Sequence, residues 1–136
     1  KRYRIEIVME LCPETLVVEG GCGQIDIVLS NLLVNAIDAL DKTASPRIVV
    51  RTWAEDAYAA IAISDNGPGV PQDIRKRLFD PFFSTKEVGQ GSGLGLSISQ
   101  AIVTKRGGFI AYDAANGEGA CFVVKLPAVD LERAKS

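Results

Sequence analysis

Hydrophobic positions recur along the chain with two spacings, one typical of strands and the other of helices. Alternation and runs of β-branched residues predict six strands, bounded by proline, glycine and polar residues. These strands are expected at residues 3–9, 15–19, 47–53, 57–64, 109–113 and 120–126. The dipeptide Glu55-Asp56 lies between the third and fourth of them and predicts a hairpin.

Helical spacing predicts two long helices, at residues 24–40 and 94–105, and a shorter one at 72–78. In the first helix, the residues that share an apolar face at about 100° per residue are Leu29, Leu33, Ala36 and Leu40. The opposite face consists of Gln24, Asn31, Asn35 and Asp38. Asparagine is unfavourable inside helices because its side chain competes for backbone hydrogen bonds. Two asparagines one turn apart therefore indicate a face that lines a site, and a solvated face is the alternative.

The element order places single helices between pairs of strands. This order indicates an α+β fold, a two-layer sandwich in which a mixed, mostly antiparallel sheet is covered on one face by helices. The chain has 136 residues, of which 47% are hydrophobic and 24% are charged, enough for one domain with a buried core. We expect a single domain over residues 1–136, with a polar tail at 128–136.

Composition excludes several classes of function. A net charge of −2 argues against nucleic-acid binding, and the sequence has neither a long apolar run nor a signal-peptide pattern. It contains no histidine, which excludes histidine-based acid–base catalysis and most zinc sites. Its three cysteines lack C-x-x-C spacing and predict reduced thiols in a cytoplasmic setting. The chain begins inside a strand-like pattern without methionine, so we expect it to be part of a longer protein.

Polar groups at four places are candidates for ligand binding on local grounds. Glycines at every second position from 89 to 95 open a predicted helix, which suits a phosphate and equally suits a flexible loop. Asp65 ends a predicted strand beside a glycine-rich turn, where it can accept a hydrogen bond from a ligand amino group or simply form a turn. Lys86 is either a phosphate partner or a solvated lysine. The amide oxygens of Asn31 and Asn35 suit Mg²⁺.

Four motifs, taken in their order and spacing, resemble the N, G1, F and G2 boxes of sensor histidine kinases. They are NLLVNA at 31–36, DNGPG at 65–69, FDPFFSTK at 79–86 and GSGLGL at 91–96. The closing stretch, GG at 107–108 and GEGACFVVKLP at 117–127, is similar to that family's last strands. The F and G2 pair looks most like that of nitrogen- and dicarboxylate-transport sensor kinases.

The resemblance covers about residues 3–127. It implies the ATP-binding catalytic domain of the gyrase, Hsp90, histidine kinase and MutL superfamily. It also implies that about three helices back the sheet and that a mobile ATP lid spans about residues 70–90.

The resemblance further implies a role for each matching residue. Asn35 is the expected Mg²⁺ ligand, Asn31 supports the metal or the phosphates, and Lys86 meets the γ-phosphate; these three are the implied catalytic residues. Asp65 accepts the adenine amino group. The residues expected to position the lid are Phe79, Phe82 and Phe83. The implied cofactors are ATP and Mg²⁺, and the nucleotide-binding set comprises Asn35, Asp38, Asp65, Gly67, Gly69, Val70, Phe79, Thr85, Lys86, Gly91, Ser92, Gly93, Leu94, Gly95 and Leu96.

Three positions depart from patterns within the superfamily. Asp38 stands where many histidine kinases carry Lys or Arg, and Ala120 stands where many carry Thr, so a hydroxyl role is absent there. Hydrolysing members place a glutamate, the general base for water, where this chain has Asn31. Because asparagine cannot take a proton, the sequence favours phosphoryl transfer to a better nucleophile, such as an imidazole brought from outside.

The resemblance thus implies Mg²⁺-ATP-dependent phosphorylation of a histidine that this chain does not contain. The acceptor is expected on an upstream dimerisation and phosphoacceptor domain, with a response-regulator receiver domain as the next partner. The fragment is expected to be monomeric within a homodimeric full protein. It is expected to contact neither nucleic acid nor membrane, and to be cytoplasmic or the cytoplasmic part of a membrane-bound sensor. The alternatives are an ATP-hydrolysing clamp, a serine kinase of the anti-sigma type and a domain that only binds a partner.

Overall fold

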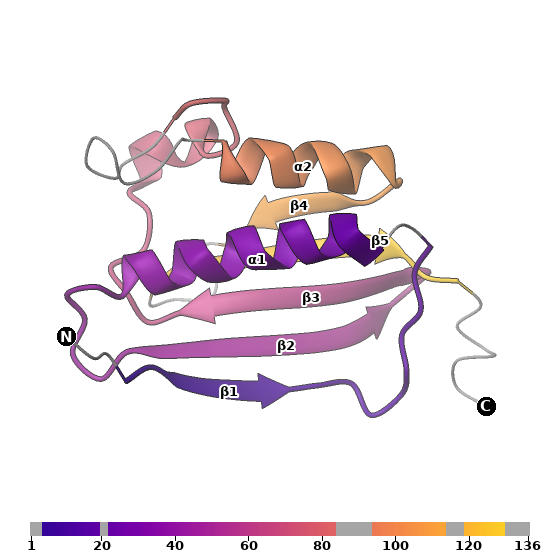
Figure 1. Cartoon of the computed structure of the whole chain (residues 1–136), viewed down its shortest axis with the longest axis horizontal. Helices are drawn as coiled ribbons and strands as arrows, with labels where there is room; N and C mark the ends of the chain where they lie inside the picture. Colours follow the sequence, from indigo (N-terminus) through magenta and orange to yellow (C-terminus); the bar gives the residue numbers. More distant parts are fainter. Residues whose placement is uncertain (1–3, 20–21, 84–93, 114–118, 130–136) are drawn as a thin grey trace.

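The computed structural model describes residues 4–19, 22–83, 94–113 and 119–129 of the chain. They include one five-stranded sheet with the strand order β1-β2-β3-β5-β4 (Figure 1). The strands are β1 (Glu6–Glu10), β2 (Arg47–Glu55), β3 (Tyr58–Asp65), β4 (Phe109–Tyr112) and β5 (Cys121–Pro127). β1 pairs with β2 in parallel, and the other three pairs are antiparallel. This confirms the mixed, mostly antiparallel sheet, and β2 and β3 form the predicted hairpin.

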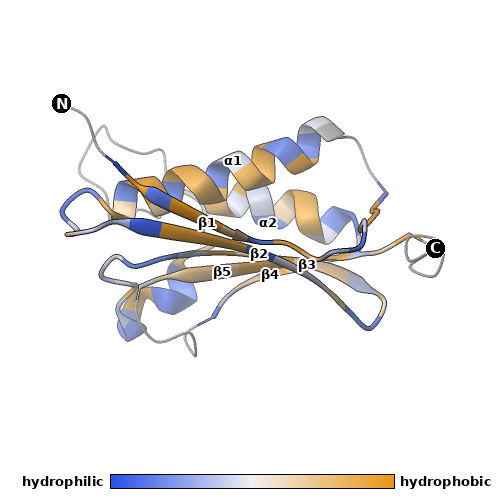
Figure 2. Ribbon diagram, turned by 90° about the horizontal axis from the view of Figure 1, so that it is seen from below, coloured by the Kyte–Doolittle hydropathy of each residue, from blue (hydrophilic) through white to orange (hydrophobic). Residues whose placement is uncertain are grey.

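Two α-helices, α1 (Cys22–Ala39) and α2 (Gly95–Lys105), cover the same face of the sheet. Figure 2 shows the sheet edge-on with both helices on one side of it. The third helical segment, η1 (Gln72–Arg77), is a 3₁₀ helix without a buried residue, where the short helix is predicted. In the part of the chain that the structure describes, no helix is long and apolar enough to cross a membrane.

The buried face of α1 is displaced by about one residue from the predicted one. Of the predicted apolar residues, Ala36 and Leu40 are buried, but Leu29 and Leu33 are only partly buried. The most deeply buried side chains of the helix are instead Val28 and Leu32. The reason is that α1 packs against α2 as well as against the sheet, so the centre of its buried stripe lies between these two neighbours.

The second predicted strand, at residues 15–19, is not a strand in the structure. This segment crosses the end of the sheet as it passes from β1 to α1 (Figure 1). In place of a strand ladder it forms an isolated bridge between Val18 and Ala128, with a hydrogen bond from Val129 N to Val17 O of 2.7 Å. β-branched composition alone predicted this strand, and composition does not reveal the direction in which a segment runs.

Candidate functional site

The described elements that carry polar features singled out in the sequence meet at one end of the sandwich. α1 ends there, α2 begins there, and β3 points its carboxyl end to the same place (Figure 1). The loop of residues 66–70 follows β3 directly, and η1 follows that loop. The fold thus brings the first helix, the DNGPG turn and the start of the second helix together.

Asn31 connects the two helices. Its Nδ2 donates hydrogen bonds to Gly95 O at 3.1 Å and to Ser99 Oγ at 3.2 Å. Ser99 is fully buried, and a Cβ on Gly95 would lie 3.7 Å from Asn31 Cγ, so the two helices are in close contact here. The side-chain amide of Asn31 therefore holds the first turn of α2 against α1.

Asn35 lies one helical turn further along α1 and is half-buried. Among the described residues, its side-chain amide has no recorded hydrogen-bond partner, which leaves its oxygen available to a ligand. Those residues also contain no group of three or more acidic, histidine or cysteine side chains that could hold a metal ion. A cation at Asn35 would therefore depend on ligand oxygens and water for most of its coordination, which is the way Mg²⁺ is usually held beside phosphates. Asp38 follows on the next turn and is exposed.

Asp65 is a buried carboxylate at the end of β3, with 7% of its surface exposed. It pairs with Ile48 across the sheet, so both side chains point toward the helix layer. Its Oδ1 accepts hydrogen bonds from Gly67 N at 2.9 Å and Ala120 N at 3.3 Å. Burial raises the pKa of Asp65, and the two N–H groups partly oppose this rise. Within the described chain both bonds reach Oδ1, so Oδ2 is the oxygen left for a ligand donor.

Close backbone approaches fix the loop around Asp65. Gly119 has a φ of 74°, and a Cβ there would lie only 1.8 Å from Asp65 O. Gly69 has a φ of 77°, and its Cβ would lie 2.9 Å from Gly119 O. The side chain of Asn66 accepts a hydrogen bond from Arg47 N at 2.7 Å and so ties the loop to the start of β2. Only glycine fits at positions 69 and 119.

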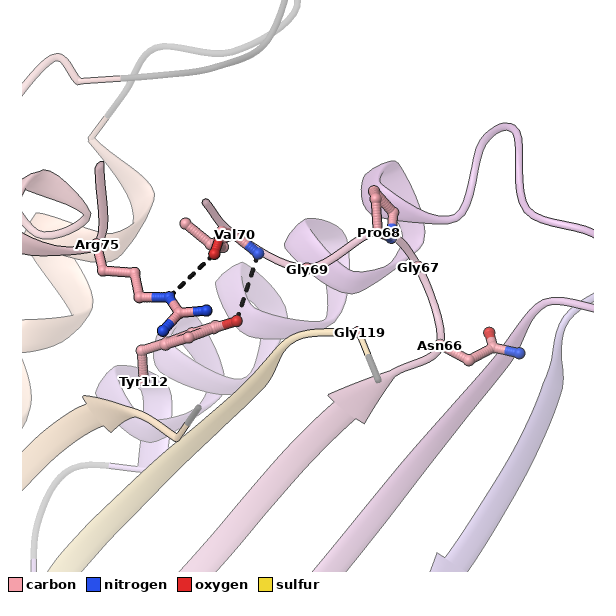
Figure 3. Close-up of a pocket in the computed structure, with 8 residues that line it drawn as sticks. All are labelled: Asn66, Gly67, Pro68, Gly69, Val70, Arg75, Tyr112 and Gly119. Carbon is pink, nitrogen blue, oxygen red and sulfur yellow. Dashed lines mark hydrogen bonds between the residues drawn. The ribbon is translucent and has the colours of Figure 1, made fainter. Parts of the chain in front are cut away.

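A cleft of about 330 Å³ lies beside this loop (Figure 3). Its lining residues are Asn66, Gly67, Pro68, Gly69, Val70, Arg75, Tyr112 and Gly119. The backbone of Val70 is held at both its polar groups, because Val70 N donates to Tyr112 Oη at 3.3 Å and Arg75 Nε donates to Val70 O at 3.0 Å. The Arg75 guanidinium also lies 5.2 Å from the centre of the Tyr112 ring.

The sequence analysis missed Arg75, Tyr112 and Gly119 as site residues. Arg75 stands in a short polar helix among other basic residues, and Tyr112 is one aromatic residue of a predicted strand. For Gly119, its place at the end of the glycine-rich GEG sequence, directly before a predicted strand, was a usable signal. No local pattern marked the other two.

The three phenylalanines of the FDPFF stretch differ in their environment. Phe79 is partly buried and packs edge-to-face on Phe122, with ring centres 6.2 Å apart. Phe83 is half-buried, and the Arg77 guanidinium lies 4.7 Å from its ring centre. Phe82 is 75% exposed and has a φ of 66°, which is unusual for a bulky residue. Of the three residues expected to position the lid, Phe79 is therefore packed against the core, whereas Phe82 is largely exposed.

The remaining candidates divide into two groups. Leu94 immediately precedes α2, and its carbonyl accepts the Ile98 N–H at 2.8 Å; Leu96 is partly buried against the core. The candidates that lie outside the described residues are Thr85, Lys86, Gly91, Ser92 and Gly93. Their expected contacts with phosphates stay predictions.

Comparison with known sequences agrees with these observations. The sequence pattern of the family described as "Histidine kinase-, DNA gyrase B-, and HSP90-like ATPase" matches residues 23–130. The chain is 41% identical over 133 residues to the two-component sensor PprA of Pseudomonas aeruginosa, a match that covers 93% of this chain and 14% of PprA. It is 38% identical over 120 residues to the C4-dicarboxylate transport sensor protein DctB of Rhizobium meliloti, covering 88% of this chain and 19% of DctB. The chain thus spans less than a fifth of the length of these two relatives.

Solved structures with a similar fold include histidine kinase catalytic domains. The nucleotide-free catalytic domain of histidine kinase ThkA superposes with a TM-score of 0.78 at 32% identity, covering 90% of this chain and 80% of that one. The mycobacterial sensor histidine kinase MprB gives a TM-score of 0.78 at 31% identity, covering 91% and 82%. ThkA in complex with the response regulator protein TrrA gives 0.75 at 28% identity, covering 92% and 34%. These similarities confirm the α+β sandwich predicted from the sequence.

Proposed function

Because the chain belongs to the histidine kinase-, DNA gyrase B- and HSP90-like ATPase family, we propose that it binds Mg²⁺-ATP and transfers the γ-phosphoryl group to a histidine on a separate phosphoacceptor domain. The observation that carries this proposal is the position of Asn31. It occupies the place where a general base would activate water, yet its amide is committed to Gly95 and Ser99. An asparagine held in this way cannot take a proton from water, so the site favours an incoming nucleophile that needs little activation.

The described residues fit the three parts of ATP at one end of the fold. Asp65 Oδ2 is available to accept a hydrogen bond from the adenine amino group, and Gly67 and Gly69 keep side chains out of the space beside it. The first turn of α2 begins at Gly95, and the N–H groups and positive dipole end at the start of a helix suit phosphate oxygens. Asn35 offers an amide oxygen to Mg²⁺, which when bound neutralises phosphate charge and orients the chain of phosphates.

The acceptor is proposed to be a histidine of another domain of the full protein, because this chain contains none. We place that histidine on an upstream dimerisation domain, so that the full protein acts as a homodimer. The histidine kinase ThkA forms a complex with the response regulator protein TrrA, which supports a receiver domain as the next partner here. In this arrangement the chain itself supplies nucleotide binding and positioning, which are the main protein contributions to phosphoryl transfer.

The test is a transfer assay with labelled ATP and a histidine-containing dimerisation domain. We expect acid-labile, base-stable label on the acceptor. Asn35→Ala is expected to lower transfer by at least about 100-fold, the loss typical of removing one preorganised electrostatic group. The matched control is Ser30→Ala, which changes an exposed residue of the same helix and leaves transfer unchanged. Label on serine, or transfer that is indifferent to Asn35, would contradict the proposal.

A further inference from the structure

We infer that Arg75 and Tyr112 are positioning residues that fix the loop of residues 66–70 for nucleotide binding by holding the backbone of Val70. This inference rests on the proposed function, because it concerns how the loop that adjoins Asp65 presents itself to the base of ATP. Neither residue needs to touch the nucleotide. Both act through the backbone of Val70.

The two hydrogen bonds of the Val70 backbone carry the inference. Its N–H donates to Tyr112 Oη at 3.3 Å, and its C=O accepts from Arg75 Nε at 3.0 Å. Tyr112 belongs to β4 and Arg75 to η1, so two separate elements hold the two polar groups of one residue (Figure 3). A loop end held on both sides cannot shift without breaking at least one of these bonds.

The two residues also support each other. The Arg75 guanidinium lies 5.2 Å from the Tyr112 ring centre, within the range of a cation–π contact. The Tyr112 ring packs edge-to-face on Phe122, with centres 5.5 Å apart and planes at 68°. Phe122 is buried in the sheet, so the support for the Val70 backbone is anchored in the core. A lysine in place of Arg75 would lose both the Nε donor geometry and the planar stack.

The opposite end of the same loop is held independently. There Asp65 Oδ1 accepts the Gly67 N–H at 2.9 Å, and Gly119 packs directly against the Asp65 backbone. With both ends fixed, the spacing between the Asp65 carboxylate and Val70 is set before any ligand arrives. Loss of the Val70 contacts should therefore weaken binding of the base while leaving the phosphate-binding start of α2 unaffected.

The experiment uses Tyr112→Phe and Arg75→Lys in the full chain. Tyr112→Phe removes only the hydroxyl and keeps the ring on Phe122, so it tests the inference even if Arg75→Lys folds poorly. Affinities for Mg²⁺-ATP and for Mg²⁺-tripolyphosphate, which has no base, are measured by displacement of a fluorescent ATP analogue. We expect each variant to lose about tenfold in ATP affinity, ~1.4 kcal/mol, and to bind tripolyphosphate within about twofold of the parent chain.

The chain offers a matched control for each variant on the opposite face of the sheet. Arg51 lies 5.3 Å from the Trp53 ring centre, and Tyr58 packs edge-to-face on Phe109 at 5.6 Å and 67°. Arg51→Lys therefore changes a guanidinium–ring contact of the same kind, and Tyr58→Phe removes the hydroxyl of a ring packed in the same way, at positions with no recorded bond to a loop backbone among the described residues. ATP affinity should stay within about twofold of the parent chain in both.

The double variant distinguishes a shared role from two separate ones. Because both side chains hold the backbone of one residue, the double variant should lose little more ATP affinity than either single variant. Unchanged ATP binding by Tyr112→Phe, or an equal loss for ATP and tripolyphosphate, would overturn the inference. A parent chain that fails to bind Mg²⁺-ATP at all would instead contradict the proposed function.

Discussion

Polar side chains serve different purposes in two regions. One is the candidate site at the end of β3 and the start of α2, called here the strand-end site; the other is the open face of the sheet, the face turned away from α1 and α2. On the open face they pair with one another: Arg51 Nε lies 3.4 Å from Glu10 Oε1 and stacks over Trp53, and Glu55 pairs with Lys125. The side chains of Arg51 and Glu10 are more than half exposed, and such exposed pairs contribute little to stability.

At the strand-end site, polar side chains bind backbone groups of other segments instead. Asp65 accepts hydrogen bonds from two backbone N–H groups, and Asn31 donates to Gly95 O. Arg75 and Tyr112 hold the backbone of Val70. A side chain that holds a loop backbone fixes the position of everything the loop carries. The comparison therefore predicts that similar substitutions have large effects at the site and small effects on the open face.

The largest effect is expected from Gly119→Ala. The added Cβ would lie 1.8 Å from Asp65 O at a φ of 74°, so β3, β5 or the loop must move. We expect a loss of at least about 3 kcal/mol in the free energy of unfolding. Gly23→Ala is the control, because its Cβ meets nothing within 4 Å and alanine favours the helix. Equal melting temperatures for the two variants in thermal unfolding would contradict the close packing at Gly119.

Asp65→Asn is expected to separate ligand binding from stability. Asparagine keeps an Oδ1 acceptor for the two N–H groups but replaces the free carboxylate oxygen with a donor. ATP affinity should fall at least about 30-fold, ~2 kcal/mol.

Burial raises the pKa of Asp65 above its ordinary 3.8. The contribution of this carboxyl group to the stability of the fold is therefore present below pH 3.8 and is lost as pH rises through the folded-state pKa.

The stability of Asp65→Asn should therefore exceed that of the parent chain at neutral pH, and the difference should shrink as pH falls toward 3.8. Thermal unfolding at several pH values measures it. Asp26→Asn, an exposed change on α1, is the control for the general effect of removing a negative charge. A variant that is less stable than the parent at neutral pH would show that the ionised carboxylate stabilises the fold.

An intermediate effect is expected from Asn31→Ala. The change removes two hydrogen bonds and leaves the buried Ser99 hydroxyl with one partner fewer. We expect a loss of about 1–2 kcal/mol in denaturant unfolding. Ser30→Ala on the exposed side of the same helix should change the unfolding free energy by less than about 0.5 kcal/mol. Similar values for the two variants would mean that Asn31 does not fasten α2.

The smallest effect is expected from Glu10→Gln on the open face. It breaks the ion pair with Arg51, in which both side chains are more than half exposed. The unfolding free energy should fall by about 0.5 kcal/mol or less, and ATP affinity should not change. A loss as large as that of Asn31→Ala would remove the distinction between the two regions.

The sequence predicted those parts of the site that depend on local patterns. Asn31 and Asn35 were found because helical spacing places them on one face, and Asp65 because it ends an apolar strand before a glycine-rich turn. Arg75 and Tyr112 were not singled out because their contacts are with the backbone of Val70, which is 42 residues from Tyr112 in the chain. A side chain can bind the backbone of any residue type, so the sequence does not reveal its partner.

The fold shows the same division between local and long-range information. The helices and the β2–β3 hairpin follow from periodicity and turn chemistry, and their bounds agree with prediction within a few residues. The failed strand at 15–19 has suitable β-branched residues, but it crosses the end of the sheet, where Val17 and Val18 make backbone contacts with Val129 and Ala128. Which edge a segment meets is decided by tertiary structure, and composition carries no record of it.

The central claim is that this site transfers phosphate to a protein nucleophile and does not activate water. Phosphate release from Mg²⁺-ATP by the chain alone tests it most directly, run beside the same reaction with a histidine-containing acceptor domain. We expect release near the buffer rate without acceptor, and rapid appearance of phosphohistidine when the acceptor is added. Sustained turnover of ATP by the chain alone, with no labelled acceptor in the parallel reaction, would contradict it.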